Sequence, residues 1–177
     1  MKNTDTLSGE WRVLKSAETV LFASRYYLRK RNDFIENIVL ALETLPEQGT
    51  ALRLMRDDEF NDSELPELIP IVVDIAIDGN IDNQVIARQV LLKYRGKKVV
   101  RDIFYAVVDK YFSILNEFIC RGLAKLSVEA GFDDVFAKLM SICKNNDNSD
   151  IAEIYDDFSI FLEPNRPGVV SSKCLIR

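Results

Sequence analysis

The chain has 177 residues, of which 47% are apolar and 29% are charged, and its formal net charge is −5. This is the composition of an ordinary folded domain and excludes a disordered chain. Seven glycines and five prolines are few, which favours long helices over strands and turns. We expect one helical domain over residues 1–163, with a C-terminal tail over residues 164–177 that begins at the first of two closely spaced prolines.

Apolar residues recur at helical spacing along most of the chain. The spacing predicts helices over residues 8–31, 34–45, 50–55, 65–77, 82–94, 97–130, 133–144 and 150–162. Ser8 is a candidate cap for the first helix, and Pro46 with Gly49 is expected to stop the second. The fold class predicted is therefore all-α, an irregular bundle of about six to seven helices around a long central helix, with the six residues 50–55 as at most a short additional helix.

The stretch over residues 97–130 is the predicted centre of this bundle. It contains no proline and one glycine, Gly122. Its apolar residues form a wide helical stripe, and charged residues occupy the other positions. A helix this apolar must be surrounded by other helices, so we expect one long central helix here.

Residues 65–77 fit two interpretations. Ile71, Val73, Ile75 and Ile77 alternate with less apolar positions, which is typical of a strand. The same segment also fits a buried helix, and its neighbours along the chain are helical, so a helix is the favoured prediction. The segment LPELIPIVVDIAIDGNIDNQVIARQVLLKY, residues 65–94, resembles one HEAT-type repeat. No second copy follows at the expected period, so the resemblance implies at most one HEAT-like helical hairpin.

Signatures of catalysis, cofactors and metals are missing from the sequence. Histidine is absent, which excludes Ser-His and Cys-His nucleophile pairs. The loop that starts at Asp78 opens like a calcium-binding EF-hand, but Asn83 stands where that loop requires glycine. The three cysteines, Cys120, Cys143 and Cys174, are too widely spaced for a metal site or a disulfide framework. We therefore predict a protein that is not an enzyme and binds no cofactor or metal.

The first residues lack the apolar core of a signal peptide, and no apolar run reaches the length of a membrane span. With its unpaired cysteines, the chain is predicted to be cytoplasmic and to have no membrane partner.

Charge is distributed unevenly along the chain. Residues 32–83 carry two basic and thirteen acidic side chains, a net charge of −11, whereas the flanking segments are basic. Such a band is either a solvated face that balances the basic segments or a docking surface for a basic protein. Under the second interpretation, the predicted contact residues are Asp57, Asp58, Glu59, Phe60, Asp62, Glu64 and Glu67, with Phe60 as an apolar anchor.

The favoured hypothesis is a protein-binding module, specifically a bacterial immunity or antitoxin-like inhibitor that neutralises a basic toxin such as a nuclease. One alternative is a helix-turn-helix DNA-binding regulator that uses Arg95, Lys97, Lys98 and Arg101. The acidic balance of the chain makes a nucleic-acid partner the less favoured one. A scaffold subunit of a larger helical assembly is the other alternative.

Overall fold

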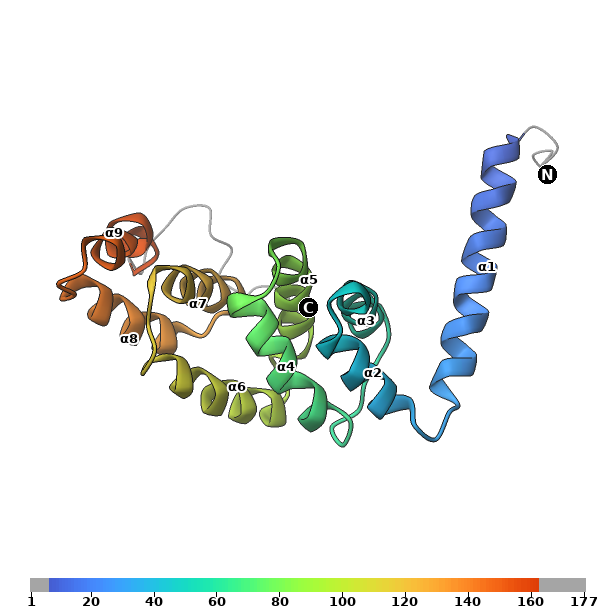
Figure 1. Cartoon of the computed structure of the whole chain (residues 1–177), viewed down its shortest axis with the longest axis horizontal. Coiled ribbons are helices and arrows are strands. Elements are labelled where there is room, and N and C mark those ends of the chain that lie inside the picture. Colours follow the sequence, from blue (N-terminus) through green and yellow to red (C-terminus); the bar gives the residue numbers. More distant parts are fainter. Residues whose placement is uncertain (1–6, 163–177) are drawn as a thin grey trace, which may run out of the picture.

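The computed structural model describes residues 7–162, and within this range the chain is entirely helical (Figure 1). Nine α-helices and one short 3₁₀ helix account for most of these residues, and the described range has no strand. The helices are α1 Gly9–Arg29, α2 Phe34–Glu43, α3 Leu45–Asp57, α4 Leu65–Asp78, α5 Ile81–Tyr94, α6 Lys98–Tyr111, α7 Glu117–Ala130, α8 Asp133–Lys144, α9 Ser149–Phe158 and η2 Ser159–Leu162. The predicted tail, residues 164–177, lies outside the described range.

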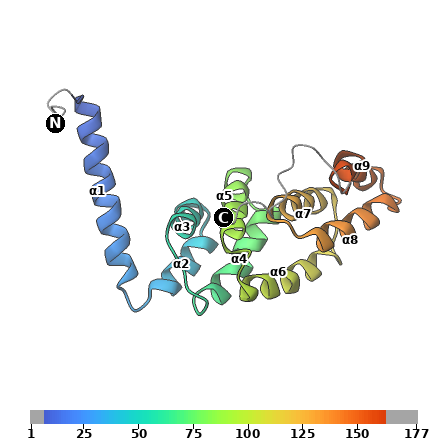
Figure 2. The same cartoon turned by 180° about the vertical axis from the view of Figure 1, so that it is seen from behind.

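Helices α2 to α9 stack into an elongated two-layered body. In one layer α4 packs between α2 and α6, and in the other α5 packs between α3 and α7. Helices α8 and α9 extend the stack beyond α7. One continuous core of buried apolar side chains runs through the body from Phe34 to Ile154. Helix α1 stands away from the body at the opposite end from α9 (Figures 1 and 2).

The predicted long central helix over residues 97–130 is wrong, because the chain breaks there into α6 and α7. The break spans residues 112–116, and the Asn116 side chain accepts a hydrogen bond of 3.0 Å from the backbone N–H of Ile119. This cap begins a new helix that folds back towards α4 and α5. The apolar stripe runs through both helices because each buries one face in the same core, so periodicity alone could not reveal the break.

Helix α4 occupies the centre of the body and resolves the ambiguity at residues 65–77 in favour of a helix. It contacts α2, α5, α6 and α7, and eight of its fourteen residues are buried. Being surrounded in this way explains why its sequence is apolar on nearly all sides and resembles a strand. Pro70 lies inside the helix, where its ring leaves the Pro66 carbonyl without a helical partner. Pro66 is exposed, so water can hydrate that carbonyl.

The N-terminal helices differ from expectation in two ways. Helix α3 begins at Leu45 and includes both Pro46 and Gly49, since proline is tolerated in the first turn of a helix. Helix α1 forms as predicted, with the Ser8 hydroxyl accepting from the backbone N–H of Trp11 at 3.3 Å. Of its apolar side, however, only Leu28 packs against the core of the body, and none of its residues is buried.

Candidate protein-binding surface

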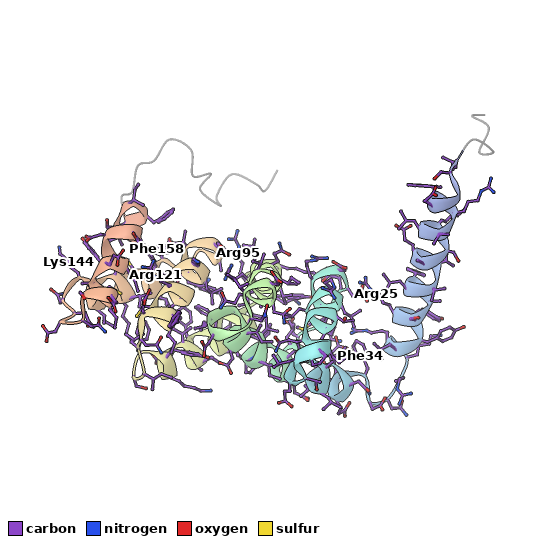
Figure 3. All side chains as sticks on the ribbon, turned by 45° about the horizontal axis from the view of Figure 1, so that its top comes forward. Arg25, Phe34, Arg95, Arg121, Lys144 and Phe158 are labelled. Carbon is purple, nitrogen blue, oxygen red and sulfur yellow. The ribbon has the colours of Figure 1, made fainter. Side chains whose placement is uncertain are left out.

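The acidic residues selected from the sequence lie at the end of α3, in the following loop and at the start of α4. Asp57 and Asp58 accept hydrogen bonds from the two terminal nitrogens of Arg25, at 3.0 and 3.2 Å. Arg25 reaches them from α1 across the gap to the body (Figure 3). Asp57 is also 2.7 Å from Arg56, and hydrogen bonds from Arg56 and then Arg25 lower the pKa of its carboxyl.

The next carboxylates along the loop are also paired inside the molecule. Glu64 binds Arg29 at 2.8 Å, and Arg29 in turn lies over the rings of Phe34 and Phe60, at 4.5 and 4.9 Å from their centroids. Two further ion pairs tie the loop to α5 and to the α5–α6 junction. They join Glu59 to Lys93 and Asp62 to Lys97.

Phe60 cannot serve as a surface anchor, because its side chain is only 2% exposed. It stacks on Phe34, and its backbone N–H donates to the Tyr94 hydroxyl at 3.0 Å. Tyr94 in turn donates to the backbone carbonyl of Asp58 at 2.9 Å, which holds the loop against α5. Glu67 is the one predicted contact that is both exposed and without an ion pair among the described residues. Five of the six selected carboxylates thus form ion pairs with cations of the basic segments of the same chain.

The cations proposed for DNA binding are divided between internal contacts and solvent. Arg95 donates to the Ala130 carbonyl at 3.4 Å, and Lys97 pairs with Asp62. Lys98 and Arg101 are exposed on α6. The opposite face of α6 is buried against α4, as expected for a core helix. The exposed face of α6 also carries acidic residues, so the structure shows no continuous basic strip there.

An apolar edge of the body, which was not predicted from the sequence, lies where the second-layer helices begin. Leu45 starts α3 and is 72% exposed, Ile81 starts α5 and is 73% exposed, and Phe118 in the first turn of α7 is 74% exposed. Large apolar side chains this exposed contribute nothing to the core. Their shared position at helix starts is therefore unexplained by folding.

Contacts between the helices place the first turns of α3 and α5 side by side and bring the first half of α7 against the end of α4. The Asn83 amide donates to the Gln48 side chain at 2.8 Å, which joins the first turns of α3 and α5. The Lys93 ammonium donates to the Arg56 carbonyl at the other end of the same two helices, so α3 and α5 run in the same direction. Gly122, four residues after Phe118 in α7, lies against the backbone of Ile77. Ile77 is near the end of α4, four residues before Ile81 starts α5. We call Glu43, Leu45, Glu47, Asp78, Ile81, Asp82 and Phe118 the turn edge.

Four carboxylates flank the apolar residues of the turn edge. Glu43 and Glu47 bracket Leu45, and Asp78 and Asp82 bracket Ile81. All four are exposed, and none forms an ion pair within residues 7–162. Glu43 and Asp78 are moreover the last residues of α2 and α4, where the helix dipole disfavours negative charge. Glu47 and Asp82 lie in the first turns of α3 and α5, where the dipole favours negative charge, so local helix stability accounts for these two acids but not for Glu43 and Asp78.

A signal for the turn edge is present in the sequence. At two helix–helix turns, an apolar residue stands between two acids, in Glu43-Thr-Leu-Pro-Glu47 and Asp78-Gly-Asn-Ile-Asp82. In the sequence, the second segment resembles only an incomplete calcium loop. Its relation to the first segment becomes apparent only when the fold places the two turns side by side.

The described residues contain no group of three or more metal-binding side chains. Cys120 and Cys143 are buried free thiols. The hydrogen bond to Cys143 and burial raise the pKa of the Cys120 thiol, which keeps it protonated and poorly nucleophilic. Cys174 lies outside the described range. None of the helices over residues 7–162 is long and apolar enough to span a membrane.

No protein-family model, curated protein or solved structure matches the chain. The function is therefore inferred from the turn edge.

Proposed function

We propose that this chain is a non-enzymatic protein-binding module that engages a basic partner through the turn edge. The observation that carries the proposal is the row of exposed Leu45, Ile81 and Phe118 among unpaired carboxylates. Apolar residues supply the desolvated centre of an interface, and charges around them steer the partner and select against acidic competitors. The turn edge replaces the loop around Asp57 and Asp58 as the main contact surface.

The finer form of the proposal is an immunity or antitoxin-like inhibitor acting in the cytoplasm of a bacterium. A basic toxin such as a nuclease would present cations around its active site, and carboxylates with no internal partner are suited to pair with them. We also propose that α4 and α5 form a HEAT-like hairpin. The short turn between them and their stacking against neighbouring helices in both layers support that description.

A pull-down from the source lysate tests the proposal with a matched pair of variants. The test variant is Glu43→Lys with Asp78→Lys, which reverses two charges of the turn edge. The control is Asp147→Lys with Glu153→Lys, which makes the same change in net charge on exposed residues in and before α9. We expect a basic protein to be retained at moderate salt by the wild type and the control, and to be lost by the test variant.

Equal retention by both variants would contradict a role for the turn edge. If the partner is instead lost only after charge reversal at Asp57 and Asp58, the binding surface is the loop predicted from the sequence. Recovery of nucleic acid alone, vanishing as salt rises, would favour the DNA-binding alternative through Lys98 and Arg101.

A further inference from the structure

Helix α1 carries a second exposed apolar surface, separate from the turn edge. It is 21 residues long, so it extends about 31 Å at 1.5 Å per residue. Only its last turns are fixed to the body, through the ion pairs of Arg25 and Arg29. The preceding turns project away from the stacked helices (Figures 1 and 2). Most of the stability of a helix in a protein comes from packing of its apolar face and little from its own sequence. We therefore expect a long projecting helix to have a packing partner.

The apolar residues of α1 form one stripe with a seven-residue repeat. The α1 stripe consists of Val13, Leu14, Ala17, Val20, Leu21, Ser24, Tyr27 and Leu28. Among its large members, only Leu28 is packed against the core of the body. Val13, Val20 and Tyr27 are 71%, 63% and 70% exposed. Repeats of this kind are typical of helices that pair along a coiled-coil seam.

The order of residues in the α1 stripe is the same when read in either direction. Pairs of large residues alternate with single small residues. The order is Val13 with Leu14, Ala17, Val20 with Leu21, Ser24, and Tyr27 with Leu28. The stripe contains no charged residue. In an antiparallel two-fold interface residue i contacts j and j contacts i, so each large pair meets a large pair and each small residue meets a small one, about an axis between Val20 and Leu21.

We propose that the α1 stripe pairs with the α1 stripe of a second copy of this chain, in an antiparallel arrangement centred between Val20 and Leu21. In this register Val13 faces Leu28 of the second copy, and the small Ala17 faces the small Ser24. Small residues that face each other allow the two helices to approach closely. The antiparallel direction also places the two bodies at opposite ends of the helix pair.

Sedimentation velocity over about 1 to 100 µM protein, the range of weak protein pairs, measures the pairing. We expect the mass of the wild type to rise from the 20.3 kDa of one chain to twice that value. Leu14→Glu with Leu21→Glu should remain monomeric throughout. Lys15→Gln with Thr19→Glu makes the same change in net charge on the opposite side of α1, where both residues are exposed, so this control should dimerise like the wild type.

Cysteine cross-linking tests the direction and does not rely on a disruptive variant. In a Cys174→Ser background, Val20→Cys should form a disulfide-linked dimer on mild oxidation, because residue 20 lies beside the two-fold axis and next to its own copy. Val13→Cys should not, because residue 13 faces residue 28. Equal cross-linking of both variants would overturn the antiparallel arrangement in favour of a parallel one.

A wild type that stays monomeric over the whole range would overturn the proposal. Co-sedimentation of such a monomer with anionic lipid vesicles would then assign the stripe to a membrane surface. Whether Glu43→Lys with Asp78→Lys loses the partner does not depend on whether α1 pairs. The two proposals can therefore fail separately.

Discussion

Gly122 has a structural role that follows from one distance. A Cβ atom placed there would stand 2.2 Å from the backbone carbonyl oxygen of Ile77, so α7 and α4 touch without a side chain between them. Gly131, which ends α7 at a φ of 72°, is required for a different reason, because side chains rarely tolerate that backbone conformation. The first glycine sets a helix crossing and the second ends a helix.

Gly122→Ala should destabilise the protein by about 1–3 kcal/mol, the usual cost of forcing extra volume into a packed contact. Thermal unfolding followed by circular dichroism measures the effect. Gly96→Ala is the matched control, because a Cβ at that position meets no atom within 4 Å. Equal melting temperatures for the two variants would show that α7 can move away from α4 at little cost.

The ion pairs of Asp57 predict how the stability of the fold depends on pH. The pKa of Asp57 is lowered from 3.8 by hydrogen bonds from Arg56 and Arg25, so the folded state binds a proton less readily than the unfolded state. The stabilisation is therefore complete above pH 3.8 and is lost as the pH falls through the lower pKa of the folded state. We expect Asp57→Asn to reduce the acid-dependent fall in melting temperature below pH 3.8. An unchanged pH profile would mean that solvent screens these pairs fully.

At the scale of single helices, α2 and α4 each end in a carboxylate and have no basic residue in the last turn. Helices α7 and α9 also lack a basic residue in the last turn, whereas α6 and α8 have Lys110 and Lys144 there. The carboxylates that end α2 and α4 stand at the two turns that expose Leu45 and Ile81, which makes them a test of the proposed turn edge.

Glu43→Lys and Asp78→Lys should each stabilise the folded chain by about 0.3–1 kcal/mol, because a cation replaces an anion at the negative end of a helix dipole. Chemical denaturation of each single variant measures the change. The same substitutions are expected to abolish partner binding. A gain in stability with a loss of binding would separate function from folding, whereas destabilisation would give these acids a structural role.

At the scale of the whole molecule, the body and α1 are held by different forces. The body is joined by one apolar core, whereas α1 is attached chiefly through Arg25 and Arg29. Regions with little buried apolar surface open at lower free energy than the core. Trp11, the only tryptophan of the chain, lies on α1 and reports on this part alone.

Denaturant unfolding of dilute protein should therefore give two transitions that do not coincide. Trp11 fluorescence should change at lower denaturant than far-UV circular dichroism, because α1 frays before the body unfolds. A control with Trp11→Phe and Phe112→Trp moves the probe to the half-buried end of α6, where the two signals should agree. Coincidence in the wild type would show that α1 and the body unfold together.

Most helices were predictable because each buries a face whose 3.6-residue period is recorded in the sequence. The bounds of α8, residues 133–144, are those predicted, and α5 differs by one residue. The long helix over residues 97–130 failed because α6 and α7 bury similar faces in one core. The internal ion pairs of the predicted acidic contact residues could not be foreseen, because Arg25, Arg29, Lys93 and Lys97 are distant in sequence and only folding brings them to the loop.

The sequence by itself determined that this chain is helical, which faces are apolar, and that its charge is concentrated in residues 32–83. These properties are local, since hydrophobic period, capping residues and composition act over a few turns. Tertiary structure alone decided which carboxylates are neutralised and which remain available. It also decided that three helix starts form one edge and that the apolar side of α1 is left uncovered. Those features depend on distances between segments far apart in the chain, which neither period nor composition encodes.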